Sequence, residues 1–196
     1  MSIESKVLGQ QVAYPTDYCP SILVPVPRSL NREIYDIHTP EELFWGFDTW
    51  HAYEAGFLAR NGLPVCGVLK LVYPANSPCI VESKSLKLYL NSLNMTRLGE
   101  DTPSGVETYL QIVKSDLEQI LQTRVEATFF RQAPEKPYFD FQDYTLLEAT
   151  PGIERETFTE YNENPALLES RTTGRGEIKA CSHLLRSNCK ITKQPD

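Results

Sequence analysis

The chain has 196 residues, of which 41% are hydrophobic and 10% aromatic, enough for one packed domain and part of a second. The formal net charge is −7 and no dense run of Lys or Arg occurs, which argues against direct binding of nucleic acid but leaves a small polar ligand possible. No apolar run could span a bilayer, and the first residues lack a basic segment followed by an apolar one, so we expect a cytoplasmic protein without membrane contact.

Residues 1–45 form an extension in which proline recurs, so we expect little regular structure there. Residues 21–26 are apolar enough to pack as an edge strand despite Pro25. Arg28 and Arg32 could bind a phosphate group, or they could be ordinary surface arginines.

Alternating apolar residues predict strands in the next segments. Residues 47–58 are rich in aromatic side chains and predict a strand, with a helix as the competing interpretation. Residues 65–73 predict a second strand, and Asn61-Gly62 between the two is a sequence typical of a hairpin turn. Two further strands are predicted at 125–131 and 144–149.

The stretch 81–94 fits two periods. Leucines at 86, 88 and 90 alternate as in a strand, whereas the apolar residues at 86, 89, 90 and 93 recur as in a helix. We favour a helix over about 83–95, with Ser83 as its N-cap.

This helix would begin with an unusual group of polar side chains. The Glu82 carboxylate, the Ser83 hydroxyl and the amines of Lys84 and Lys87 would converge on its first turns. Such a group suits a polar ligand or a phosphate-bearing partner, because a helix N-terminus attracts anions. The alternative is an ordinary solvated amphipathic helix.

A second helix is predicted over about 105–122. Ser104 and Glu107 match the spacing of a capping box. One face is apolar, formed by Val106, Leu110, Val113, Leu117 and Leu121. The polar side chains of Glu107, Lys114, Asp116 and Glu118 are expected to face solvent.

The predicted order is strand, strand, helix, helix, strand, strand, which indicates an α+β fold with both helices on one face of an antiparallel sheet. Residues 46–150 would form this unit, and the polar segment 151–176 would be a linker. Residues 177–196 regain apolar character and would open a second, incomplete unit.

The cysteines do not predict a disulfide framework. There are five, at scattered positions: Cys19, Cys66, Cys79, Cys181 and Cys189. Cys181, His183 and Cys189 offer three possible zinc ligands, but there is no Cys-x-x-Cys pair and no evident fourth ligand. We therefore expect no metal.

Two motifs resemble one known family. Residues 82–89, Glu-Ser-Lys-Ser-Leu-Lys-Leu-Tyr, resemble the signature of the QueF family of NADPH-dependent 7-cyano-7-deazaguanine reductases. Residues 183–196, His-Leu-Leu-Arg-Ser-Asn-Cys-Lys-Ile-Thr-Lys-Gln-Pro-Asp, resemble the catalytic segment of its two-unit members. The resemblance implies a tunnelling fold, built as ββααββ, and a homo-oligomer, because such units cover their sheet edges by assembling into barrels.

The resemblance also implies roles for individual residues. Cys189 would be the nucleophile and Asp196 the general acid and base. Glu82 and Ser83 would bind the deazaguanine, and Ser83, Lys84 and Lys87 would contact NADPH. A nitrile would be reduced to an aminomethyl group through a covalent thioimide, in the biosynthesis of the modified tRNA base queuosine. No G-x-G-x-x-G segment occurs, so a Rossmann fold is not expected to hold the cofactor.

The family pattern continues past Asp196 with the rest of a second unit. We therefore expect this chain to be truncated after Asp196 and, alone, to be inactive or severely impaired. Two other functions stay open. A cyclohydrolase-type tunnelling enzyme would need a metal site, for which His38, His51 and His183 show no arrangement. A purine-binding or assembly module without catalysis would leave Cys189 inert.

Overall fold

The computed structural model describes residues 15–40, 45–131, 143–161, 164–167 and 176–184. By its internal contacts the chain divides into two compact units, Met1–Pro134 and Glu135–Asp196. The boundaries expected from the sequence remain predictions: an extension (1–45), a first unit (46–150), a linker (151–176) and a second unit (177–196).

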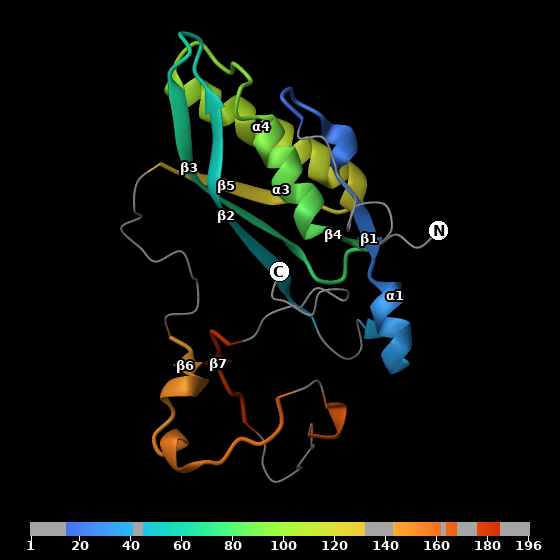
Figure 1. The fold of residues 1–196 in the computed structure, drawn as a ribbon. Coiled ribbons are helices and arrows are strands. Elements are labelled where there is room, and N and C mark those ends of the chain that lie inside the picture. Colours follow the sequence, from blue (N-terminus) through green and yellow to red (C-terminus); the bar gives the residue numbers. More distant parts are fainter. Residues whose placement is uncertain (1–14, 41–44, 132–142, 162–163, 168–175, 185–196) are drawn as a thin grey trace. The chain divides into compact units, whose positions relative to one another are not determined.

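The first unit combines antiparallel strands with two main helices, which confirms the predicted α+β class (Figure 1). Its strands are β1 (Pro25–Pro27), β2 (Phe47–Leu58), β3 (Pro64–Pro74), β4 (Cys79–Val81) and β5 (Glu126–Phe130). Its helices are η2 (Pro20–Ile22), α1 (Ser29–Arg32), η3 (Glu33–Tyr35), α3 (Ser83–Ser92) and α4 (Thr102–Leu121). The main sheet has the order β2-β3-β5, and β1 pairs separately with β4.

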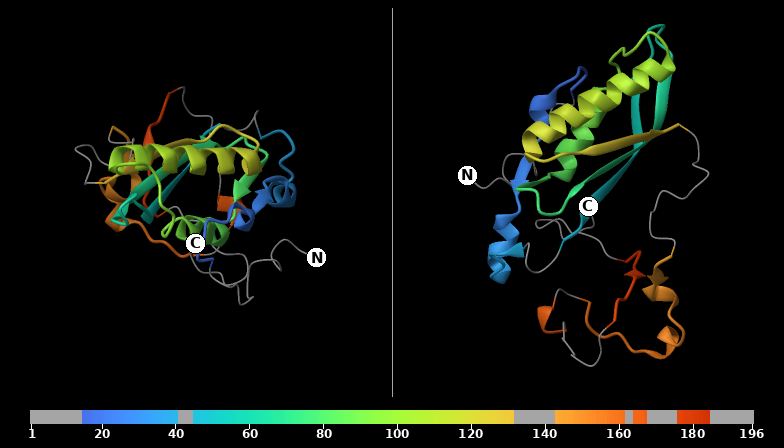
Figure 2. Two further views of the ribbon diagram at one scale, coloured as in Figure 1. Left: turned by 90° about the horizontal axis from the view of Figure 1, so that it is seen from above. Right: turned by 180° about the vertical axis from the view of Figure 1, so that it is seen from behind.

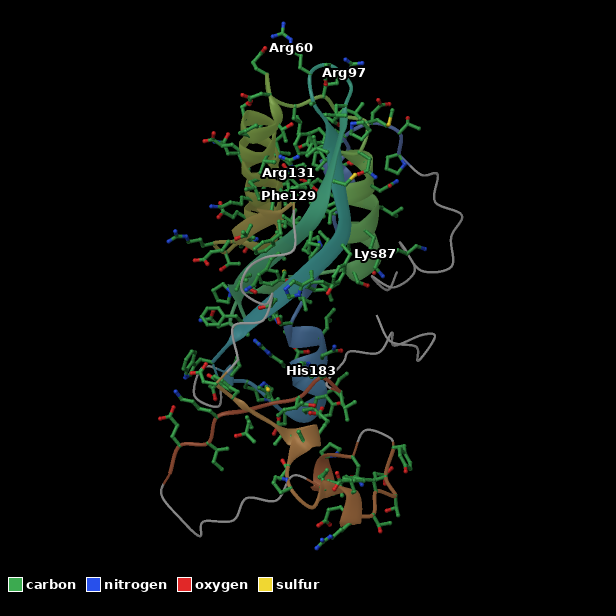
Figure 3. All side chains as sticks on the ribbon, turned by 90° about the vertical axis from the view of Figure 1, so that its left-hand side faces the viewer. Arg60, Lys87, Arg97, Phe129, Arg131 and His183 are labelled. Carbon is green, nitrogen blue, oxygen red and sulfur yellow. The ribbon has the colours of Figure 1, made fainter. Side chains whose placement is uncertain are left out.

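The long hairpin of β2 and β3 forms as predicted. The two strands pair antiparallel from Phe47↔Pro74 to Leu58↔Pro64. At the turn, Asn61 Oδ1 accepts a hydrogen bond from the Leu63 backbone N–H at 3.0 Å, and Gly62 adopts φ +88°. Glycine suits this turn because a positive φ strains most other residues. Arg60 and Arg97, labelled in Figure 3, lie at this end of the hairpin, where Arg97 donates to the Arg60 carbonyl at 2.7 Å.

One face of the sheet packs against α3 and α4. From β3, Leu69, Leu71 and Tyr73 are fully buried, which matches the predicted alternation. Figure 2 shows from behind how the chain leaves α4 and returns beneath it as β5. Phe129 on β5 (Figure 3) meets Tyr109 of α4 with ring centroids 5.4 Å apart. No helix among the described residues is long and apolar enough to cross a membrane.

Helix α4 begins earlier than predicted. Its N-cap is Asp101, which accepts from the Ser104 backbone N–H at 2.9 Å, while Ser104 Oγ accepts from the Asp101 N–H at 3.1 Å. The predicted capping box of Ser104 with Glu107 was therefore wrong, because the helix begins about one turn earlier and its capping box is formed by Asp101 and Ser104. The buried stripe is Gly105, Tyr109, Val113, Leu117 and Leu121, so Val106 and Leu110 pack only at its margin.

Two polar side chains of α4, expected to face solvent, hold other segments in place. Asp116 accepts from the Tyr89 hydroxyl of α3 at 2.5 Å and from the Tyr18 hydroxyl at 2.7 Å. Burial and the neighbouring Asp116 carboxylate raise the pKa of Tyr89 well above its usual value, because both disfavour the phenolate. Glu118 accepts from the Val125 N–H at 3.0 Å at the start of the return to β5.

The described part of the extension, residues 15–40, contains more regular structure than its prolines suggest. The strand expected at 21–26 lies at Pro25–Pro27 and pairs antiparallel with β4. Proline is tolerated there because an edge strand needs few of its own N–H donors. Strand β4 itself was not predicted, since three residues are too few for a clear alternation.

The described part of the second unit is small. It contains β6 (Thr145–Leu146), η4 (Leu147–Ala149), η5 (Ile153–Arg155), η6 (Pro165–Leu167) and β7 (Ala180–Cys181). The prediction of a fourth strand of the main sheet at 144–149 was wrong, because β6 is only two residues long and pairs in parallel with β7. The chain turns into η4 directly after β6.

The close packing of Gly105 against β2 generates a prediction. A Cβ there would lie 2.6 Å from Phe57 Cε2 and 2.8 Å from the Leu98 carbonyl oxygen. Alanine favours helix over glycine by about 1 kcal/mol, but overpacking costs about 1–3 kcal/mol. Because one of the two close atoms is a backbone oxygen, which cannot easily move aside, the overpacking cost should lie in the upper part of this range. We therefore expect Gly105→Ala to lower the free energy of unfolding in urea by about 1–2 kcal/mol.

Gly46→Ala is the control, because a Cβ at Gly46 would meet no heavy atom within 4 Å. The free energy of unfolding of this control should lie within about 0.5 kcal/mol of that of the parent protein. A Gly105→Ala protein as stable as the parent would contradict the packing described here.

Candidate functional site at the start of helix α3

The signature residues lie where β4 ends and α3 begins. Glu82 has an extended backbone, with φ −72° and ψ 129°, and its N–H donates to the Val24 carbonyl at 3.0 Å. The β1–β4 pair therefore continues to Glu82, and Ser83 is the first residue of the helix.

Glu82, not Ser83, is the N-cap of α3. Its Oε1 accepts from the Lys84 N–H at 3.0 Å, and its Oε2 accepts from the Ser85 N–H at 2.6 Å. The prediction of Ser83 was wrong because a glutamate side chain in an extended residue can fold back over the first turn, although shorter side chains are commoner caps. The carboxylate also complements the positive end of the helix dipole.

Ser85 joins the helix start to the extension. It is fully buried, and its hydroxyl donates to the Glu82 carbonyl at 2.8 Å and accepts from the Val24 N–H at 3.1 Å. A buried hydroxyl needs such partners, because an unpaired one costs about 1–3 kcal/mol. Glu82 and Ser85 are therefore fixed by the fold itself.

The other signature residues face outward to different degrees. Ser83 and Lys84 are half-buried, and Lys87 is exposed one turn further along. Figure 3 shows the Lys87 side chain extending from α3 away from the sheet. The structure thus brings Glu82, Ser83 and Lys84 together at one helix start, with Lys87 on the next turn.

The cap limits how this helix start can bind an anion. The N–H groups of Lys84 and Ser85 already donate to the Glu82 carboxylate, whose own charge repels a phosphate. A phosphate bound here would have to be met by the lysine side chains. The expectation that the helix N-terminus itself favours a phosphate therefore does not hold at these two donors.

A buried tyrosine supports the strand that leads into the site. The Tyr73 hydroxyl accepts from Trp50 Nε1 at 2.8 Å and from the Val81 N–H at 3.4 Å. Burial raises the pKa of Tyr73 to about 12, so the hydroxyl stays protonated at neutral pH. Sequence reasoning missed this contact, since β4 has too short a pattern to reveal its neighbours.

Arg28 and Arg32 serve the fold. Arg28 forms an ion pair with Asp48 and donates from Nε to Ser77 Oγ at 3.2 Å, and its side chain is only 11% exposed. Arg32 donates to the Ala75 carbonyl at 2.7 Å. Both hold the loop between β3 and β4, so neither contact supports the phosphate-binding interpretation.

The predicted reacting residues, Cys189 and Asp196, lie outside the described residues. Within the described part, no group of three His, Cys, Asp or Glu side chains is placed to hold a metal ion. His183, at the end of that part, is labelled in Figure 3.

Comparison with known proteins gives one consistent family. Residues 14–129 match the model described as "Nitrile reductase, 7-cyano-7-deazaguanine-reductase N-term". The NADPH-dependent 7-cyano-7-deazaguanine reductase of Acinetobacter baumannii strain ACICU is 39% identical over 197 residues, covering 100% of this chain and 68% of that protein. The enzyme of the same name from Coxiella burnetii strain Dugway is 35% identical, covering 98% of this chain and 66% of that protein. This chain therefore spans about two thirds of the length of these relatives.

The identity of the α3 cap can be tested by a matched pair of variants. Glu82→Ala removes the acceptor for two backbone N–H groups and should lower the free energy of unfolding in urea by about 0.5–2 kcal/mol. Ser83→Ala removes a hydroxyl that does not cap the helix. Its free energy of unfolding should lie within about 0.5 kcal/mol of that of the parent protein. If Ser83→Ala lowered the free energy of unfolding as much as Glu82→Ala, the assignment of the cap to Glu82 would be wrong.

Proposed function

The chain belongs to the 7-cyano-7-deazaguanine reductase family, and we propose that it takes part in the NADPH-dependent reduction of 7-cyano-7-deazaguanine to 7-aminomethyl-7-deazaguanine. Members of this family are oxidoreductases, and their tunnelling fold agrees with the antiparallel sheet and its helices. The observation that carries the proposal is the signature Glu82–Tyr89, which forms a helix start where a carboxylate held by two backbone N–H groups lies beside Ser83 and Lys84, with Lys87 on the next turn.

Glu82 and Ser83 are proposed to bind the deazaguanine. A guanine-like edge presents N–H donors, and each carboxylate oxygen accepts more than one hydrogen bond, so a capping Glu82 can still accept from a ligand. Because two backbone N–H groups orient this carboxylate, it would need little reorganisation on binding. The neighbouring half-buried Ser83 hydroxyl would complete the polar contact.

Cys189 and Asp196 are proposed to carry the chemistry. The Cys189 thiolate would add to the nitrile carbon, opening one π bond of the C≡N group and forming a C–S bond. Asp196, as a carboxylic acid, would give its proton to the nitrogen, which yields a neutral thioimide. When reduction at carbon is followed by departure of the thiolate, the C–S bond breaks and an imine remains for a second reduction.

The cofactor contacts are proposed for the side chains of Ser83, Lys84 and Lys87 at the start of α3. NADPH, when bound, supplies hydride, and reducing a nitrile to an amine takes two hydrides and two protons. Lys84 and Lys87 would meet its phosphates with their ammonium groups, as the occupied helix N–H donors require. Ser83 lies between Glu82 and Lys84 and could serve both ligands.

The biological setting belongs to the same proposal. The product would enter queuosine biosynthesis, in the cytoplasm. Cys19, Cys66, Cys79 and Cys181 are free thiols, which agrees with a reducing compartment. Self-association is also proposed, because β2 and β5 are the edges of the described main sheet and β2 exposes Phe47 and Tyr53, each at 63%.

Formation of the thioimide can be tested by intact-mass spectrometry with 7-cyano-7-deazaguanine in the absence of NADPH. We expect an adduct of the ligand's mass at Cys189, because no reductant is present to release it. Asp196→Asn should slow its formation by about 10²–10⁴-fold, since the nitrogen would lose its proton donor.

Cys189→Ala should abolish the adduct, whereas Cys181→Ala should retain it. An adduct that persists in Cys189→Ala would contradict the assignment of the nucleophile. If the parent chain gives none, the same measurement on a chain extended past Asp196 decides whether further residues complete the pocket or the substrate is wrong.

The cofactor contact predicts a separate effect on NADPH. In the chain that turns over the nitrile, whether the parent or the one extended past Asp196, Lys87→Ala should raise the KM for NADPH about tenfold, which corresponds to about 1.4 kcal/mol, and leave the KM for the nitrile unchanged. Lys114→Ala on α4 is the matched control and should change neither constant. Added salt should reduce the difference in the KM for NADPH between the parent protein and Lys87→Ala, because an electrostatic contact at an exposed lysine is screened by salt. Equal KM values for NADPH in the two proteins would contradict this contact.

A further inference from the structure

Two serines of α3 hold the same segment of the extension, residues 19–24, which lies against this helix. The Ser85 hydroxyl accepts from the Val24 N–H at 3.1 Å, and the Ser92 hydroxyl accepts from the Cys19 N–H at 3.2 Å. Each hydroxyl also donates to the backbone carbonyl three positions earlier, at 2.8 Å from Ser85 and 2.6 Å from Ser92. Both serines are fully buried and lie about two turns apart on one face of α3. The two ends of the segment are therefore held by matched contacts.

The Ser85 contact includes the N-cap of the helix. In α4, the N-cap Asp101 and Ser104 form a closed box, because the Ser104 hydroxyl accepts from the Asp101 N–H at 3.1 Å. Glu82 and Ser85 hold the same two positions in α3, but the Glu82 N–H donates to the Val24 carbonyl at 3.0 Å. Val24 is thus inserted into the capping box of α3, with its carbonyl bound to the N-cap and its N–H bound to the serine.

The result is a closed ring of three hydrogen bonds around the backbone of Glu82. They run from the Val24 N–H to the Ser85 hydroxyl, from that hydroxyl to the Glu82 carbonyl, and from the Glu82 N–H to the Val24 carbonyl. The Glu82 carboxylate is held separately, by the backbone N–H groups of Lys84 and Ser85. Alanine at position 85 would keep both of these N–H donors and open the ring. The ring and the carboxylate cap can therefore be separated by one substitution.

We propose that Ser85 is a positioning residue for Glu82: its hydroxyl ties residues 19–24 to the N-cap and so fixes where the carboxylate meets the deazaguanine. This inference rests on the proposed function, in which Glu82 binds that ligand. Ser85 is fully buried and therefore acts through Glu82, not on the ligand itself. A carboxylate on a fixed backbone loses less freedom when a ligand binds, so opening the ring should weaken binding.

The test measures adduct formation with 7-cyano-7-deazaguanine in the absence of NADPH, in the chain that forms the adduct, whether the parent or the one extended past Asp196. Ser85→Ala should raise the half-saturating concentration of the nitrile about tenfold and change the maximal rate less than about threefold. Ser92→Ala is the matched control, because it removes the same pair of contacts at the other end of the segment. It should change either value less than about twofold.

Urea unfolding separates this effect from a loss of stability. Both variants remove a buried hydroxyl with two partners, so their unfolding midpoints should fall by similar amounts. A difference in nitrile binding between two equally destabilised proteins would then come from the position of Ser85 beside Glu82.

Because Ser85 acts through Glu82, the effects of substituting the two residues should not add. Glu82→Gln should raise the half-saturating concentration by at least about tenfold, since hydrogen bonds to a neutral acceptor are weaker than those to a carboxylate. In the Glu82→Gln protein, Ser85→Ala should raise it further by less than about twofold.

If Ser85→Ala does not fold, Val24→Pro replaces it, because proline lacks the N–H that donates to Ser85 and keeps the carbonyl that accepts from Glu82. Equal half-saturating concentrations for Ser85→Ala and Ser92→Ala, or a full effect of Ser85→Ala in the Glu82→Gln protein, would overturn the inference while the proposed function stands. If Glu82→Gln binds the nitrile like the parent protein, or if neither chain forms an adduct, the proposed function fails and the inference fails with it.

Discussion

The structure of the first unit depends on the junction at which Glu82 and Ser85 join β1, β4 and α3. The Glu82 carboxylate caps the helix, its backbone N–H pairs with Val24, and the buried Ser85 hydroxyl bridges the two. Each such hydrogen bond contributes only about 1 kcal/mol, but leaving a buried partner unpaired costs more. The junction therefore sets both where the helix begins and how the signature side chains are presented.

This junction divides the signature into two sets of residues. Glu82 and Ser85, three positions apart, are used by the fold, whereas Ser83, Lys84 and Lys87 are the residues for which we propose contacts with a ligand. Glu82 belongs to both sets, because a carboxylate that accepts two backbone N–H groups retains further acceptor capacity. A substitution there would change stability and binding together, so the two effects must be measured separately. Lys87, exposed on the next turn, offers the cleaner test of ligand contact.

Carboxylates recur as the means by which this chain fixes backbone and hydroxyl donors. Asp116 holds the hydroxyls of Tyr18 and Tyr89, and Glu118 holds the N–H of Val125. Glu148 does the same for a turn in the second unit. Polar side chains on a helix are usually solvated, so a sequence pattern cannot distinguish the few that bind distant segments. Their partners lie 27 to 98 positions away in the case of Asp116.

Local periodicity, turn residues and a contiguous motif were enough to predict the β2–β3 hairpin, the two helices, the α+β class and the family. Three features could be read only from the folded chain: Glu82 caps α3, Asp101 caps α4, and residues 145–146 pair with β7 outside the main sheet. The physical reason is that a cap or a strand pairing depends on which donors and acceptors meet after folding. Periodicity records which side of a segment is buried, but not which partner each polar atom will find.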